Sequence, residues 1–334
     1  MKAAILKGYG PKSSFVITEV NTPTLGKNDV LVEVHASTVN PIDWKIHKML
    51  SFLPRNGGIT KPLILGRDVS GIVKAIGSEV RDVSIGEAVY GMSVNFLAGT
   101  YAEFSAVKAH NIAPKPNDLS FEEAAAVPLA GLTALQALQI SNVKAGTEIL
   151  IIGGSGGVGS FAVQIATAMG AQVSAVCSGK NSDFVKSLGA VEVIDYTNKD
   201  FTKDARDFDV IFDATGYESL TSCSSLLKEG GVYITTTPNL KSSFDIVKGK
   251  IFRHGKKIKT VFTDSNNRNL KQLTEYIEKG QIKVIVDSEY SFSDINLSHE
   301  KSMTHRAVGK IIVKIRDKTS ALHDQQKSES VQID

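Results

Sequence analysis

The stretch Ile151-Ile152-Gly153-Gly154-Ser155-Gly156-Gly157-Val158-Gly159 decides the fold of this 334-residue chain. The glycines at positions 154, 156 and 159 satisfy the pattern GxGxxG, which a flexible linker could also supply. Here the pattern follows the apolar run 148–152, typical of a parallel strand covered on both faces, and opens an amphipathic helix over 157–169. A glycine turn between a buried strand and a helix is where many proteins hold the phosphates of a dinucleotide.

Each glycine of the turn has a physical role in that arrangement. The first permits the tight turn, the second lets the backbone approach a pyrophosphate, and the third lets the helix pack closely on the strand. The helix then presents its N-terminal amides and the positive end of its dipole to the phosphates. A purely structural turn is the alternative. We predict that a dinucleotide is bound by Gly154, Ser155, Gly156, Gly157, Val158 and Gly159.

Strand and helix patterns alternate around this turn, which predicts a parallel, doubly wound sheet of the Rossmann type. The expected strands are residues 148–152, 173–176, 191–194, 208–212 and 232–236. The expected helices are residues 157–169, 183–188, 218–227 and 269–279. The fold class is therefore α/β over this part of the chain.

Before residue 120 the pattern is mainly β, with short strands separated by glycine and proline turns. The expected strands are residues 30–36, 15–19, 69–76, 87–90 and 101–107. Ser120 and Glu123 form a capping-box pattern that starts a helix, which Pro128 should interrupt. Residues 309–315 read as a last strand that returns to the β-rich half. We expect a β domain over 1–120, completed by about 285–316, a dinucleotide-binding domain over 121–284, and a frayed tail over 317–334.

Composition excludes several classes of protein. A net charge of +3 is too small to argue for nucleic acid, so no nucleic-acid partner is expected. Only two cysteines occur, Cys177 and Cys223, which rules out a disulfide framework and favours two buried thiols. We expect no membrane span, because no run of 18 apolar residues occurs. The N-terminus lacks a signal-peptide pattern, so a cytoplasmic location is expected.

The end of the second strand of the α/β part bears on which dinucleotide binds. An NAD site usually has an acid there, which bonds the ribose hydroxyl. Here the segment reads Ala175-Val176-Cys177-Ser178-Gly179-Lys180-Asn181, with a hydroxyl, a cation and an amide but no acid. Such a segment suits a 2′-phosphate, so NADPH is the predicted cofactor, with Lys180 near the phosphate. A solvated surface lysine is the alternative for Lys180.

Several strings in this order resemble the zinc-free quinone oxidoreductase branch of the medium-chain dehydrogenases. The strings lie at residues 39–45, 65–71, 153–159, 176–178, 188–190, 194–196 and 308–312. They are most similar to the group that contains the mitochondrial reticulon-interacting quinone reductase. The resemblance runs over about residues 1–315, and it implies a GroES-like β domain interrupted by a Rossmann domain. It also implies a homo-oligomer, for which we expect a homodimer.

The resemblance implies roles for individual residues. Asn40 and Asp43 would line the cleft below the nicotinamide, with Asn40 bonding the substrate oxygen and Lys45 stabilising the developing oxyanion. The alternatives are a plain turn at Asn40-Pro41, a structural Asp43 and an exposed Lys45.

The same resemblance implies further contacts to the cofactor. Thr133 would lie near the nicotinamide, although it could be an ordinary helix threonine. Ser178 and Tyr196 match positions that contact the adenosine 2′-phosphate, and Arg306 would add positive charge there.

The resemblance also bears on metal chemistry. Zinc-using relatives place a cysteine where this chain has Asn40, and a histidine followed by glutamate where it has Arg67-Asp68. His35, His47 and His110 do not have the spacing of a zinc site, so no metal is expected.

Loss of the zinc ligands decides which substrates are plausible. Zinc lowers the pKa of bound water from about 15.7 to about 7. A similar gain for an alcohol is worth roughly 12 kcal/mol, which a single Lys or Tyr does not readily replace. A quinone or enone accepts hydride without such help. We therefore predict an NADPH-dependent quinone reductase, with an enal or enone reductase and a non-catalytic NADPH-sensing interaction protein as alternatives.

Overall fold

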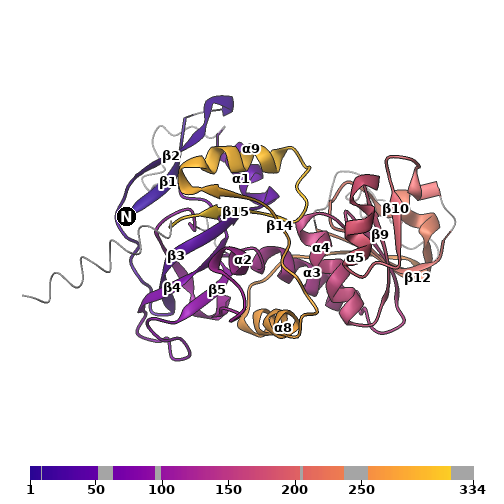
Figure 1. Ribbon diagram of the computed structural model, residues 1–334, viewed down its shortest axis with the longest axis horizontal. Coiled ribbons are helices and arrows are strands. Elements are labelled where there is room, and N and C mark those ends of the chain that lie inside the picture. The colour runs from indigo at the N-terminus through magenta and orange to yellow at the C-terminus, as the bar shows by residue number, and fades with distance from the viewer. Residues whose placement is uncertain (9, 52–62, 95–98, 204–205, 237–254, 317–334) are drawn as a thin grey trace, which may run out of the picture. The chain divides into compact units, whose positions relative to one another are not determined.

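The computed structural model describes residues 1–8, 10–51, 63–94, 99–203, 206–236 and 255–316. The predicted tail, 317–334, lies outside the described residues. Internal contacts divide the chain into two compact units. Unit 1 comprises Met1–Leu129, Ser265–Lys271 and the segment from Val286, and unit 2 comprises Ala130–Asp264 and Gln272–Ile285. Figure 1 labels the elements of both.

Unit 2 is built around a six-stranded parallel sheet in the order β10-β9-β8-β11-β12-β13. Its strands are β8 (Glu148–Ile152), β9 (Gln172–Cys177), β10 (Glu192–Asp195), β11 (Phe208–Asp213), β12 (Leu227–Thr235) and β13 (Lys257–Thr260). In chain order this is 3-2-1-4-5-6, the Rossmann arrangement. The order reverses between β8 and β11, and ligands of such sheets bind at the carboxyl ends of the strands at that point.

The helices of unit 2 lie before, between and after these strands in the chain. They are α3 (Pro128–Ile140, which begins at the end of unit 1), α4 (Gly157–Ala168), α5 (Ser182–Ser187) and α6 (Leu220–Cys223). Short 3-10 turns add η3 (Gly179–Asn181), η4 (Phe201–Lys203) and η5 (Ser224–Leu226), and α8 (Asn267–Glu278) starts in unit 1 and ends in unit 2. A parallel strand covered on both faces explains why β8 is apolar and buried from Ile149 to Ile152.

Unit 1 contains a seven-stranded sheet in the order β14-β15-β3-β4-β5-β7, with β6 also paired to β3. The strands are β3 (Asp29–Val39), β4 (Asp68–Ile76), β5 (Ala88–Met92), β6 (Phe104–Lys108), β7 (Ile112–Pro114), β14 (Val286–Ser291) and β15 (Lys310–Lys314). A separate antiparallel pair is formed by β1 (Lys2–Lys7) and β2 (Ser14–Glu19). All pairings of the larger sheet are antiparallel except β14 with β15.

Helices cover the sheet of unit 1. They are α1 (Pro41–Ser51), α2 (Phe121–Ala125) and α9 (Ile295–Met303), with 3-10 turns η1 (Gly10–Lys12), η2 (Ala109–Asn111) and η7 (Phe292–Asp294). Ile311 and Val313 of β15 pack into the large core with Ile295 of α9, whereas Ile312 packs with Ala125 of α2. Side chains alternate across a strand, so α9 and α2 lie on opposite faces of β15. No described helix is long and apolar enough to cross a bilayer.

The predicted fold class is confirmed, and so are most of the predicted elements. The Ser120 capping box is present in both directions, and α2 and α3 are separated before Pro128 as expected. The predicted helix over 218–227 is wrong in extent: α6 ends at Cys223, and β12 begins at Leu227. Helices α1 and α9 were not predicted, because the segment before residue 120 and the last segment were both interpreted as β.

The units differ from the predicted domains at two places. Residues 121–129 belong to unit 1, because α2 packs against β3, β4 and β15. The start of α8 also belongs to unit 1, where Tyr90 of β5 donates its hydroxyl to the Leu270 carbonyl at 2.6 Å. Sequence patterns locate elements but carry no information on which sheet an isolated helix covers.

Candidate active site

The glycine turn joins β8 to α4, as the sequence predicts. Gly153 and Gly154 donate their backbone N–H groups to the Val176 carbonyl of β9, at 2.9 and 3.0 Å. The residue with positive φ is Gly153 (+85°), one position before the GxGxxG pattern. Gly154, to which the sequence assigned the tight turn, lies in the same turn, and a Cβ at this position would lie only 2.9 Å from the Ala175 Cβ.

The turn leaves open space at Gly156 but no room for a side chain at Gly159. A Cβ at Gly159 would lie 2.0 Å from the Gly153 carbonyl oxygen, so Gly159 is required for the helix to approach the strand. A Cβ at Gly156 would meet only the Gly153 oxygen, at 3.5 Å, and would otherwise point into open space. Gly156 is the N-cap of α4, and no side chain caps this helix. The first-turn amides therefore fit an anionic group from a ligand.

The segment after β9 carries the residues predicted to select the cofactor. Ser178 is half-buried, Lys180 is exposed in η3, and Tyr196 is 57% exposed. Asn181 donates from its side-chain amide to Ser155 Oγ at 3.2 Å, which ties this segment to the glycine turn. These residues belong to the same unit as the turn.

An acid missed by the sequence analysis lies beside this segment. Asp195 ends β10, opposite Cys177 in the register, and a Cβ at Gly179 would meet its carboxylate at 2.3 Å. Thr197 and Asn198 donate hydrogen bonds to the carboxylate at 2.7–2.9 Å, and the bonds from Thr197 lower the pKa of Asp195. The acid of a typical NAD site is expected at the end of the second strand, whereas Asp195 ends the third.

Two further predicted cofactor residues lie elsewhere in the chain. Thr133 is buried in α3 of unit 2, and its hydroxyl lies 2.6 Å from that of Thr263. Arg306 is exposed between α9 and β15 of unit 1. The structure therefore does not bring Arg306 together with Ser178 and Tyr196 within one unit.

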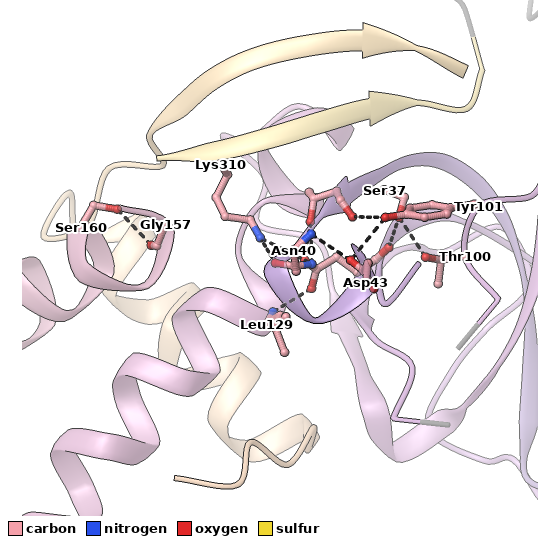
Figure 2. Close-up of polar contacts among 11 residues, drawn as sticks. Ser37, Asn40, Asp43, Thr100, Tyr101, Leu129, Gly157, Ser160 and Lys310 are labelled. Carbon is pink, nitrogen blue, oxygen red and sulfur yellow. Dashed lines mark hydrogen bonds and ion pairs between the residues drawn. The ribbon is translucent and has the colours of Figure 1, made fainter. Parts of the chain in front are cut away.

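Asn40 lies in a buried polar network of unit 1 that the sequence did not predict. Its side-chain amide donates to Asp68 Oδ2 at 2.9 Å, and its Oδ1 accepts a hydrogen bond from the Lys310 ammonium. Lys310 Nζ also lies 3.3 Å from Asp68 Oδ2. Figure 2 shows Lys310 reaching from β15 toward Asn40, and it shows Leu129 on the opposite side of Asn40 from Lys310. Asn40, Asp68 and Lys310 are 3%, 0% and 4% exposed, so this is a fully desolvated ion pair with a bridging amide.

Asp43 is the third residue of α1 and is also buried. Its Oδ2 accepts from the Asn40 backbone N–H at 2.8 Å and from the Tyr101 hydroxyl at 3.3 Å. Burial, together with the nearby Asp68 carboxylate, raises the pKa of Asp43 to about 6, against the lowering effect of the hydrogen bond from the Asn40 backbone.

The network continues from Asp43 to a buried histidine. Tyr101 Oη lies 3.2 Å from His299 Nε2 of α9. Burial holds the pKa of Tyr101 well above its ordinary value and lowers that of His299 to about 3. At neutral pH the Tyr101 phenol and the His299 imidazole are therefore uncharged, and Asp43 is the member of this branch that titrates near neutrality.

Lys45 is separate from this network. It is exposed on α1, and its ammonium lies 5.7 Å from the centroid of the Trp44 ring. An exposed cation on an aromatic face contributes little electrostatic stabilisation, because water screens it. The structure thus brings Asn40 and Asp43 together but leaves Lys45 outside their hydrogen-bonded cluster.

In the part of the chain that the structure describes, no three His, Cys, Asp or Glu side chains come together as a metal site would require. Cys177 and Cys223 are both buried, as the sequence predicts, and burial raises their thiol pKa values to about 11 and about 12. These thiols are therefore protonated at neutral pH and poor nucleophiles.

Comparison with known proteins identifies the family. Residues 26–117 match the alcohol dehydrogenase GroES-like domain, and residues 188–313 match the zinc-binding dehydrogenase family. The mouse mitochondrial NAD(P)H oxidoreductase RTN4IP1 is 32% identical, over 94% of this chain and 89% of the relative. The chain belongs to the quinone oxidoreductase branch of the medium-chain dehydrogenase/reductase superfamily.

Two more relatives support this placement. The chloroplastic NADPH-dependent alkenal/one oxidoreductase of Arabidopsis thaliana is 32% identical, over 94% of this chain and 79% of its own length. The structure of the Coxiella burnetii quinone oxidoreductase superposes with a TM-score of 0.83 at 32% identity, over 95% of this chain and 99% of that one. The chain is therefore an NAD(P)H-dependent oxidoreductase of this superfamily.

Sequence reasoning missed Asp68, Lys310, Tyr101 and His299 as members of the site. The sequence does contain a signal for Lys310 and Asp68. Lys310 stands between Gly309 and an apolar run, and Asp68 opens another apolar run, so both place a charge at a position that a strand pattern marks as buried. A buried charge requires a partner of opposite sign.

A matched pair of variants separates the two glycine roles. We expect Gly159→Ala to prevent correct folding of the turn, because its Cβ would meet the Gly153 oxygen. Gly156→Ala should fold normally, since φ at this residue is −78°, but should weaken NADPH binding at least tenfold by filling the space above the turn. Thermal unfolding and NADPH fluorescence titration measure both. Unchanged NADPH affinity in Gly156→Ala would contradict the assignment.

Asp43 makes stability depend on pH in a defined direction. Its pKa of about 6 in the folded protein exceeds the ordinary 3.8, so the folded state binds the proton more tightly than the unfolded state. Ionisation therefore costs stability, a cost that is absent below about pH 4 and complete above about pH 6. The shift corresponds to roughly 3 kcal/mol. The stability of Asp43→Asn relative to wild type should rise by that amount from pH 4 to pH 7.

Urea unfolding followed by the single tryptophan, Trp44, measures this difference within unit 1. A stability difference that stays constant from pH 4 to pH 7 would show that Asp43 does not titrate as its burial implies.

Proposed function

We propose that the chain is an NADPH-dependent, zinc-independent oxidoreductase that transfers hydride to a quinone. This proposal depends on one observation, namely which side chains form the buried network of unit 1. At the positions where zinc-using relatives place a cysteine and a histidine-glutamate pair, this chain has Asn40 and Arg67-Asp68, with the Lys310 ammonium bonded to Asn40 and Asp68. An amide, a carboxylate and an ammonium that satisfy one another are not a zinc donor set.

The glycine turn and the segment after β9 would hold the cofactor. The amides of Gly156, Gly157 and Val158 would receive the diphosphate, while Ser178 and Lys180 would contact the 2′-phosphate. Tyr196 would lie beside the adenosine, and Thr133 near the nicotinamide. NADPH supplies a hydride when bound, and a relative whose printed name includes NADPH dependence supports this choice over NADH.

A quinone suits this site because its reduction needs no metal. When a quinone gains a hydride, one negative charge develops on its oxygen, and a phenol pKa near 10 makes that oxygen easy to protonate. The Asn40 amide and the neighbouring buried groups would orient the acceptor, and Asp43 would hold the Asn40 backbone through its 2.8 Å hydrogen bond. The printed name of the Coxiella relative supports a quinone acceptor.

Reduction of the double bond of an enal or enone is the second candidate. It is favoured by the plant alkenal/one oxidoreductase, which is as similar to this chain as the quinone reductase structure is. Both acceptors place the developing charge on an oxygen, so the same network serves either reaction. A homodimer, a cytoplasmic location and the alternative of a non-catalytic NADPH sensor stay predictions.

Cofactor preference can be tested on one side chain. Lys180→Met should raise the KM for NADPH about five- to tenfold and leave the KM for NADH unchanged, because only the 2′-phosphate needs the cation. Lys186→Met, at an exposed position on α5, is the matched control and should change neither. Equal effects of Lys180→Met on both cofactors would contradict a 2′-phosphate role.

The reaction itself is tested by following NADPH oxidation with benzoquinones, naphthoquinones, alkenals and alkenones, with and without a chelator. We expect turnover with quinones that the chelator does not change. Faster turnover with alkenones would favour the enone reductase. Loss of activity with the chelator, restored by zinc, would contradict a metal-free site, and NADPH binding without turnover on any acceptor would favour a sensor.

A further inference from the structure

We propose that Lys310, rather than Lys45, is the catalytic cation that stabilises the oxyanion of the reduced acceptor. This inference rests on the proposed function. It starts from burial: Lys310 opens β15 and is 4% exposed, whereas Lys45 is exposed beside the Trp44 ring. A fixed charge in a desolvated site acts far more strongly on a developing charge than a solvated one does.

The contacts of the Lys310 ammonium within the described residues use two of its three N–H donors. An ammonium has three N–H donors. Lys310 donates to Asn40 Oδ1 and lies at the long distance of 3.3 Å from Asp68 Oδ2. These are its two acceptors among the described residues. The third donor of a buried ammonium needs an oxygen, and an acceptor that gains negative charge provides one.

The negative charge of the Asp68 carboxylate could neutralise the positive charge of Lys310. Asp68 Oδ1 accepts from the Leu129 backbone N–H at 2.7 Å, in the first turn of the 13-residue helix α3. Its Oδ2 accepts from Thr38 Oγ1 at 2.5 Å and from Asn40 Nδ2 at 2.9 Å. The carboxylate is therefore stabilised by three donors besides Lys310, and one of the three lies at a helix N-terminus. Lys310, at 3.3 Å, is a fourth and longer contact.

Reduction of the acceptor takes one hydride and one proton, and Lys310 acts between these two additions. The acceptor gains one hydride, which brings two electrons, and its oxygen becomes negative. The Lys310 ammonium faces that oxygen and lowers the energy of the anion, and a proton from water completes the reduction. The benefit grows with the basicity of the oxygen: an enolate-like anion of an enone needs the cation more than the phenolate of an electron-poor quinone.

The experiment measures this gradient, that is, how the effect of the cation depends on the basicity of the acceptor oxygen. Lys310→Met is compared with wild type on acceptors graded by the pKa of their reduced oxygen, from halogenated benzoquinones to alkenones. We expect kcat/KM to fall about 10²–10³-fold for the most basic oxygens and much less for the least basic. NADPH affinity should not change. Lys314→Met, the same substitution four residues along β15 at a half-buried ion pair with Glu289, is the matched control and should stay within about twofold of wild type on all acceptors.

A purely structural role would give a different pattern. Misfolding lowers the amount of active enzyme and therefore reduces kcat/KM by the same factor on every acceptor. Because Lys310→Met leaves Asp68 buried without its cation, the charge-neutral double variant Lys310→Met/Asp68→Asn is measured as well, and the same gradient is expected. An equal loss on all acceptors in both variants, or a gradient produced by Lys45→Met alone, would overturn the proposal. Wild-type protein that reduces no acceptor would instead overturn the proposed function.

Discussion

The buried Asp68 carboxylate is the constraint on which unit 1 depends. A carboxylate without solvent costs several kcal/mol unless donors surround it. Asp68 is 0% exposed and meets this requirement with donors from separate parts of the unit: Thr38 and Asn40 around the end of β3, Leu129 at the start of α3, and Lys310 on β15. The same four contacts that stabilise the carboxylate place an amide and an ammonium side by side, and this pair forms the candidate active site.

In unit 2 the constraint is steric rather than electrostatic. Gly159 must lack a side chain so that α4 can approach the turn, and Gly153 must adopt a positive φ. Once these two conditions hold, the first-turn amides of α4 have no side-chain cap and form a site for an anion. In the proposed function the units have different roles: the backbone amides of unit 2 would bind the phosphates, and the desolvated charge of unit 1 would stabilise the reacting oxygen.

The sequence predicted the local parts of this arrangement and missed the distant ones. Strands of the Rossmann unit and the Ser120 capping box were predicted because periodicity and caps are set by residues a few positions apart. Helix α1 was missed although Asn40-Pro41-Ile42-Asp43 combines an N-cap residue, proline at the first position and an acid at the third. The Asn40–Lys310 contact joins residues 270 positions apart, and no local pattern encodes it. The resemblance implied Lys45, which belongs to the matching stretch 39–45 with Asn40, whereas Lys310 is near Asn40 only in space.

The most direct test of this account is a crystal structure of the protein with NADP⁺ and a phenolate that mimics the reduced acceptor. We expect the phenolate oxygen to lie about 3 Å from Lys310 Nζ, with Asn40 and Asp68 still bonded to the same ammonium. A phenolate oxygen bound at Lys45 instead, with Lys310 contacting only Asn40 and Asp68, would contradict it.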